Sequence, residues 1–218
     1  MRWPCTVLAI VVWGIAESES LGGIVSQASA NETDTANENI WEGSLSAAAY
    51  IVRNGRDYVN PILTADHNWL HLEARYNYEA YQTGSLWLGY NFGFGNKLAF
   101  EVTPMIGGVF GDIDGVAPGY TISISYASFE LYTQGEYFFD SATHDGNFFY
   151  NWSEFSYSPT SWFRFGLVLD RTKALGSNFD VRRGPLIGFK YKKVDLTAYW
   201  LGPGSEDSTF VLAATLSF

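Results

Sequence analysis

The chain has 218 residues, a formal net charge of -10 and an aromatic content of 17%. Its mean hydropathy is only -0.05, although 47% of its residues are hydrophobic. Apolar residues are therefore dispersed among polar ones and do not form the runs of about 20 that a helical membrane protein needs. The acidic balance argues against nucleic-acid binding, which requires a basic face. With Cys5 as the single cysteine, a disulfide framework and a cysteine metal site are excluded, and we predict no cofactor.

The first 30 residues have the pattern of a secretory signal peptide. Arg2 supplies the positive start and residues 7–16 an apolar core too short to span a bilayer. Cleavage is expected after Ala16 or after Ala30, each of which ends a small-x-small triplet. Residues 31–43 are acidic, lack periodicity and are expected to form a flexible lead-in. We therefore predict one further domain, residues 44–218.

From Ser44 onward the chain consists of segments in which apolar and polar residues alternate, the side-chain period of a β-strand. A first hairpin is predicted at residues 46–53 and 58–65. Ten clearer segments follow: 68–80, 85–94, 97–110, 119–126, 129–139, 147–157, 162–172, 182–192, 194–201 and 208–218.

The segment at residues 68–80 shows the pattern most clearly. One face is apolar and the other carries His71, Glu73, Arg75 and Glu79. Its apolar face consists of Leu70, Leu72, Ala74, Tyr76 and Tyr78. A soluble β-sandwich or barrel would not pair such aromatic outer faces with carboxylates, guanidiniums and amides on the other face. We therefore favour strands whose apolar face meets lipid.

The connections between the segments alternate in length. Short turns are predicted near Gly95, Ala127, Pro159 and Lys193, and longer loops at residues 111–118, 140–146, 173–180 and 202–207. Outer-membrane barrels have short turns at one end and longer loops at the other, and an even number of strands. We predict a closed, all-β, antiparallel transmembrane β-barrel of twelve strands, or of ten if the first hairpin is absent.

The C-terminal segment ends on an aromatic residue after alternating apolar positions: Phe210, Leu212, Leu216 and Phe218. It resembles the last strand of bacterial outer-membrane β-barrels, whose assembly machinery reads such an ending. The stretches at residues 70–79, 86–95 and 129–140 resemble small, porin-like barrels without an assigned activity. The resemblance implies the outer membrane of a Gram-negative-type bacterium. It also implies outer-membrane lipid, lipopolysaccharide and the barrel assembly machinery as partners.

The inward faces of the predicted strands carry the candidate functional residues, which we expect to line the lumen: His71, Glu73, Arg75, Glu79, Glu101, Glu130, Glu136, Arg164, Asp170, Arg182, Lys190 and Asp195. Glu154 and Lys192 are placed on the same face. Charges inside a barrel must be hydrated or paired, because a lone buried charge costs several kcal/mol.

Three functions follow from such a lumen. The first is a narrow passive channel for small solutes or ions, tilted towards cations by the excess of acids. The second is a closed structural barrel whose charges pair across the lumen. The third is an outer-membrane lipid or peptide hydrolase that uses His71 with neighbouring carboxylates for acid–base work. We expect the chain not to be an enzyme, because we identify no family motif that joins a nucleophile to one of its three histidines.

Overall fold

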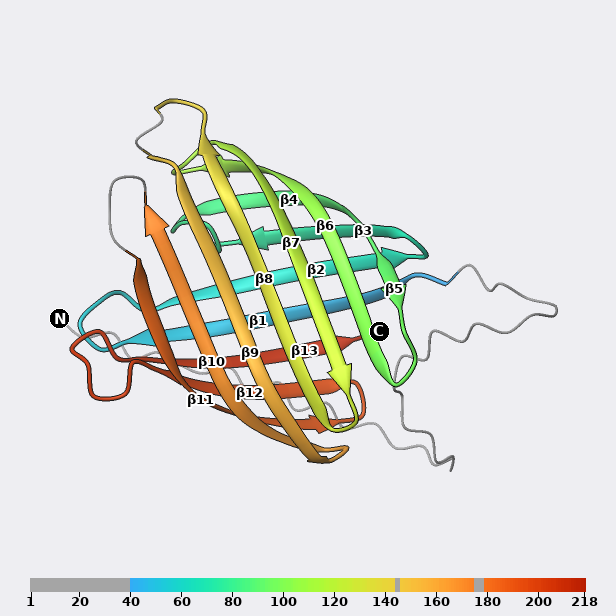
Figure 1. Cartoon of the computed structure of the whole chain (residues 1–218). Helices are drawn as coiled ribbons and strands as arrows, with labels where there is room; N and C mark the ends of the chain where they lie inside the picture. The colour runs from blue at the N-terminus through green and yellow to red at the C-terminus, as the bar shows by residue number, and fades with distance from the viewer. Residues whose placement is uncertain (1–39, 144–145, 175–178) are drawn as a thin grey trace, which may run out of the picture.

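The computed structural model describes residues 40–143, 146–174 and 179–218, so the predicted signal peptide and most of the lead-in lie outside the described residues. It is built of β-strands wound into a barrel (Figure 1). The strands are β1 (Glu42–Val52), β2 (Tyr58–His67), β3 (Leu70–Tyr76), β4 (Thr83–Tyr90), β5 (Phe92–Phe94), β6 (Leu98–Gly111), β7 (Gly115–Tyr126), β8 (Phe129–Asp140), β9 (Phe148–Thr160), β10 (Phe163–Ala174), β11 (Asp180–Tyr191), β12 (Val194–Leu201) and β13 (Thr209–Ser217). In the part of the chain that is described, no helix has the length and apolar character needed to cross a membrane.

The sheet closes on itself with twelve strands in its wall. Apart from β4 and β5, strands that follow one another in the sequence pair antiparallel; β1 also pairs with β13, and β4 with β6. The short β5 is the continuation of β4 beyond Asn91. Gly89 of β4 faces Met105 and Phe92 of β5 faces Val102, so the register on β6 does not change. The prediction of a closed antiparallel barrel with twelve strands is therefore confirmed, and the first hairpin is present as β1 and β2.

The connections differ in length at the two ends of the barrel. The turns at residues 68–69, 95–97, 127–128, 161–162 and 192–193 have two or three residues and form the turn end. Most connections at the other, loop end are longer, at 53–57, 77–82, 141–147 and 202–208. The predicted loop at 111–118 is shorter than expected, since β7 already begins at Gly115. In barrels of this kind the loop end faces outward from the cell.

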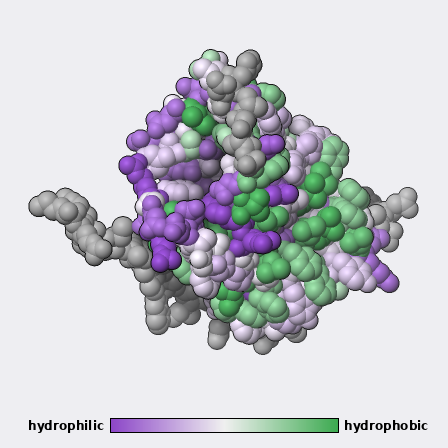
Figure 2. All heavy atoms as spheres, turned by 60° about the vertical axis from the view of Figure 1, so that its left-hand side comes forward, coloured by the Kyte–Doolittle hydropathy of each residue, from purple (hydrophilic) through white to green (hydrophobic). Residues whose placement is uncertain are grey.

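The outer wall is apolar along most strands. Leu86, Leu167 and Tyr191 are 61%, 64% and 75% exposed, and each alternates with an inward neighbour. Exposure of so many large apolar side chains is unfavourable in water and favourable in hydrocarbon. Figure 2 shows hydrophobic residues over the barrel wall and hydrophilic residues gathered around the loop end. The fold is thus built for a membrane.

Tyr78 departs from the predicted pattern. β3 ends at Tyr76, and Asn77 then has a positive φ of 57°, a conformation that asparagine adopts more readily than most residues. Asn77 holds the turn with its side chain, accepting a hydrogen bond from Gln82 N and donating one to Val59 O. The chain changes direction there, so the prediction that Tyr78 faces outward is wrong.

One polar patch interrupts the apolar wall near the loop end. Asn151 of β9 faces outward, as does Arg171 opposite it on β10. Only 1% of Asn151 is exposed, because its amide donates to Gln134 O (2.8 Å) and Thr133 Oγ1 (2.9 Å). Its Oδ1 accepts from Arg171 Nη2 (2.8 Å). These polar groups satisfy one another, which is what a position close to lipid requires.

Candidate functional site: the lumen

A buried ion-pair cluster of the lumen is built around Arg75, whose side chain is only 2% exposed. Arg75 donates from Nε to Glu73 Oε1 at 2.6 Å and from Nη1 to Glu136 Oε2 at 2.8 Å. Glu136 lies on β8, which is reached from β3 by way of β4, β6 and β7. The ion pair therefore crosses the lumen and does not run along its wall.

Aromatic rings complete this layer. The guanidinium carbon of Arg75 lies 4.3 Å from the ring centre of Tyr78 and 4.2 Å from that of Trp87. Gln134 Nε2 donates to the Tyr78 hydroxyl at 2.5 Å and fixes the inward-turned loop against β8. We call Arg75, Tyr78, Trp87 and Glu136 the constriction layer. Stacked rings and an ion pair in one layer leave little room for water.

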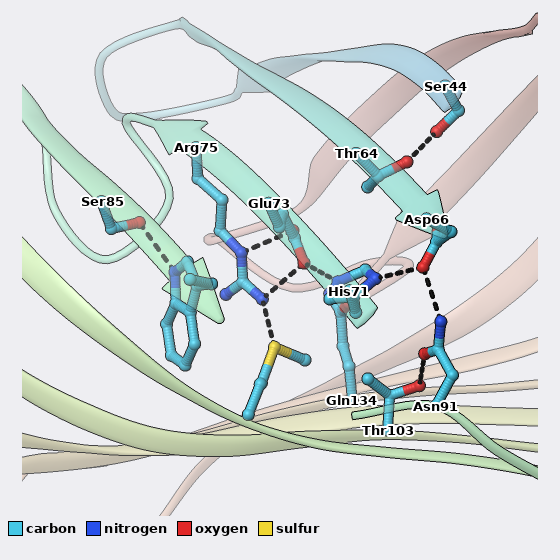
Figure 3. A network of polar contacts seen from close by, with 12 residues as sticks. Ser44, Thr64, Asp66, His71, Glu73, Arg75, Ser85, Asn91, Thr103 and Gln134 are labelled. Atoms are coloured by element: carbon cyan, nitrogen blue, oxygen red, sulfur yellow. Dashed lines mark hydrogen bonds and ion pairs between the residues drawn. The ribbon is translucent and has the colours of Figure 1, made fainter. Parts of the chain in front are cut away.

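A polar chain leads from the constriction layer towards the turn end (Figure 3). Glu73 Oε2 lies 3.2 Å from His71 Nε2, and His71 Nδ1 lies 2.8 Å from Asp66 Oδ1. Asn91 Nδ2 then donates to the same Asp66 oxygen at 2.7 Å and Thr103 Oγ1 donates to Asn91 Oδ1 at 2.7 Å. Hydrogen-bonded charges of this kind rigidify one side of the lumen.

The opposite side of the lumen is filled by a second, mainly apolar cluster. Trp152 and Tyr199 meet edge to face with 5.2 Å between ring centres, and Val168, Leu186 and Val211 are buried with them. The carboxylate of Glu154 accepts hydrogen bonds from Trp152 Nε1 (2.7 Å) and the Tyr199 hydroxyl (2.9 Å). Side chains therefore fill the middle of the barrel from both sides.

The loop end of the lumen is hollow. A cavity of about 290 Å³, which we call the outer vestibule, is lined by residues of β1, β2, β8, β9, β10, β11 and the loop at 77–82. The lining residues are Tyr50, Tyr58, Asn60, Tyr78, Glu79, Glu136, Phe148, Tyr150, Asp170, Thr172, Ala174 and Arg182. Its lining is thus rich in tyrosine and carboxylate.

The turn end of the lumen is open to solvent. Arg164 pairs with both oxygens of Asp195, yet the two side chains are 25% and 23% exposed. Thr121 and Ser123 on β7 are partly exposed, and Glu130 is exposed. From the loop end to the turn end, the lumen consists of a vestibule, a middle filled by side chains and a half that is open to solvent.

The structure places the predicted lumen residues as follows. His71, Glu73, Arg75, Glu136 and Asp170 face inward and are buried, whereas Arg164, Arg182 and Asp195 face inward and are partly exposed. Glu101, Glu130 and Lys190 lie on the inward face where it is open to solvent. Glu79 is not in a strand. The loop at 77–82 carries it inward, where its Oε1 accepts a hydrogen bond from Ser85.

The prediction that Lys192 lies on the inward face of a strand is wrong. It lies in the turn between β11 and β12, and its ammonium is 5.6 Å from the outward ring of Tyr191.

Some lumen residues were not predicted from the sequence. Asp66, Asn60 and Tyr58 are inward residues of the first hairpin, to whose two segments no faces were assigned. Strict alternation continued over residues 58–66, one residue beyond the predicted segment, would have identified them.

Both ring nitrogens of His71 lie against carboxylates, those of Asp66 and Glu73. Neither nitrogen is left to take a proton from a nucleophile, so the geometry does not favour the hydrolase. Among the residues the structure describes, no group of three or more histidine, cysteine, aspartate and glutamate side chains converges in a way that could hold a metal ion.

No family model matches the sequence, and no curated protein matches it. Solved structures do match. A KdgM porin has 12% identity and a TM-score of 0.57, over 80% of this chain and 99% of that chain, and its complex with disordered oligogalacturonate matches with 11% identity and the same TM-score. The outer membrane protein Omp33 of Acinetobacter baumannii has 10% identity and a TM-score of 0.50, over 82% of this chain and 98% of that one.

Identities this low establish the fold alone. The class is clear from the fold and the wall together: this is a closed twelve-stranded transmembrane β-barrel. More particularly, it has the porin-like fold of bacterial outer-membrane proteins, and its apolar exterior agrees with a location in that membrane. The assembly role of Phe210, Leu212, Leu216 and Phe218 stays a prediction, although all four lie on the outside or at the end of β13.

Proposed function

We propose that the protein is a narrow passive channel for small solutes that prefers cations. The observation that carries this proposal is the division of the lumen. A vestibule at one end and a half that is open to solvent at the other are separated by side chains, chiefly the constriction layer. Side-chain rotations occur on short timescales, so a layer of side chains can open briefly for a small solute without unfolding any strand.

The charges of the lumen support the preference for cations. Inward acids exceed inward bases along its length: Asp66, Glu73, Glu79, Glu101, Glu130, Glu136, Glu154, Asp170 and Asp195 against Arg75, Arg164, Arg182 and Lys190. A ring or excess of carboxylates raises the local concentration of cations. The same lining disfavours oligogalacturonate, the ligand named for the KdgM complex, because its carboxylates would meet like charge.

The test is single-channel recording from purified protein in planar bilayers, with wild type beside Tyr78→Ala. Loss of the Tyr78 ring widens the constriction layer, so we expect conductance to rise severalfold. The matched control is Tyr76→Ala, because Tyr76 lies two residues earlier and faces lipid. It should leave conductance unchanged. In a salt gradient the reversal potential should have the sign of cation selectivity. If neither the wild type nor Tyr78→Ala gives conductance steps, the proposal is overturned.

A closed structural barrel is the second candidate. It is favoured by the ion pair between Arg75 and Glu136, which ties β3 to β8 across the lumen, and by the packed cluster around Trp152. In that case Tyr78→Ala would conduct no better than Tyr76→Ala. The recordings therefore separate the two candidates directly.

A further inference from the structure

Four buried side-chain oxygens have no hydrogen-bond partner among the described residues: Asn60 Oδ1, Glu79 Oε2, Glu136 Oε1 and Asp170 Oδ1. Each belongs to a residue that lines this one cavity. Asn60, Glu136 and Asp170 are at most 5% exposed, and the side chain of Glu79 is 0% exposed. A buried acceptor left without a donor is destabilising, because folding removes its hydrogen bond to water and supplies no replacement.

The other oxygen of each carboxylate is already engaged. Glu79 Oε1 accepts from Ser85, Glu136 Oε2 from Arg75, and Asp170 Oδ2 from Arg182 at 2.5 Å. The pairings therefore hold each side chain in place beside the cavity and leave its second oxygen without a donor. All four orphan atoms are acceptors, so their complement is a group that carries donors.

The other residues that line the outer vestibule favour a positively charged hydrogen-bond donor over a neutral one. The rings of Tyr50 and Tyr58 are stacked, 4.5 Å apart and 7° from parallel, and Tyr78 and Tyr150 meet edge to face at 5.5 Å. Aromatic faces attract organic cations. With three carboxylates against the single Arg182 among the lining residues, the vestibule is also negative. A neutral polyol would satisfy the acceptors but would gain nothing from this charge.

We propose that the outer vestibule binds small organic cations with several N–H donors, of the alkyl polyamine class. A flexible chain with separated ammonium groups reaches dispersed acceptors, whereas a metal ion needs ligands gathered at one point. A cavity of about 290 Å³ is near the lower limit for small-molecule sites, which suits a slender ligand. The inference deepens the proposed cation channel by naming a solute class, and its binding step does not require conduction.

The test uses the full-length protein in detergent and isothermal calorimetry with spermidine, with magnesium chloride at equal ionic strength and glucose as comparison titrants. The variant is Glu79→Gln, which keeps the shape of the side chain and removes its charge. Its matched control is Glu130→Gln, which removes one carboxylate from the half of the lumen that is open to solvent. We expect spermidine to bind wild type and Glu130→Gln equally and to bind Glu79→Gln on the order of tenfold more weakly.

A second measurement does not depend on any variant folding. Spermidine should raise the midpoint of wild-type urea unfolding, because a ligand of the folded state stabilises it, and magnesium at equal ionic strength should not. Equal affinity in Glu79→Gln and wild type, binding of glucose in place of spermidine, or equal effects of spermidine and magnesium would each overturn the inference. If bilayers show no conductance while spermidine binds wild type and Glu130→Gln more tightly than Glu79→Gln, the proposed channel is refuted and the proposed binding site is supported.

Discussion

The constriction layer is a buried cross-link between distant strands, and replacing Arg75 tests whether water is excluded from it. In Arg75→Met the carboxylates of Glu73 and Glu136 lose their hydrogen bonds at 2.6 and 2.8 Å. Removing one partner of a buried ion pair costs about 3–5 kcal/mol, because the other charge is left uncompensated. Two aromatic faces also lose a cation at 4.2 and 4.3 Å, worth about 0.5–2 kcal/mol each. We therefore expect a loss of at least about 3 kcal/mol.

The matched control is Arg164→Met, in which an arginine of the same lumen loses a carboxylate partner. Because Arg164 and Asp195 are about a quarter exposed, water replaces the lost contact. The expected cost is about 1 kcal/mol or less, the range of hydrated ion pairs. The assay is urea unfolding from lipid vesicles followed by tryptophan fluorescence. Equal losses in the two variants would show that water reaches Arg75 and would refute a dry constriction layer.

Two further predictions concern packing on either side of the wall. Gly107→Ala should destabilise the barrel by about 1–3 kcal/mol, since a Cβ there would lie 2.5 Å from the ring of Trp87. Gly108→Ala, with nothing within 4 Å, should be nearly neutral. Asn151→Ala should cost about 1–3 kcal/mol in the same unfolding assay, because Arg171 loses its acceptor beside lipid. Equal effects of the two glycine variants, or an unchanged midpoint for Asn151→Ala, would contradict these packing arguments.

The wall of the barrel was predictable because its constraint is local. A strand has a side-chain period of two, and lipid on one face forces apolar residues to every second position. Leu86, Leu167 and Leu212 follow that rule and face outward. Arg171 breaks the rule, and alternation alone cannot explain it. Its position depends on Asn151, which lies on the neighbouring strand and compensates its polarity.

The interior was predictable only in part, because its contacts join residues far apart in sequence. Alternation placed Arg75 and Glu136 on the inward side, but which charges meet depends on barrel closure and on the stagger of the strands. The loop at 77–82 was missed for a local reason. The positive φ of Asn77 follows the end of β3 and redirects the chain before Tyr78, and the continuing aromatic pattern concealed that change of direction.

The number of strands links the stability of this barrel to its permeability. Barrels of about eight strands are filled by side chains, and those of sixteen or more enclose wide pores. At twelve strands, one arginine on β3 reaches a glutamate on β8, with an aromatic ring on either side of the guanidinium. The same contacts that cross-link the wall therefore occupy the path of a solute. Loss of the Tyr78 ring should mainly widen the path, whereas loss of the Arg75 charge should also weaken the wall. Conductance and unfolding free energy measured on the same variants can separate these two roles.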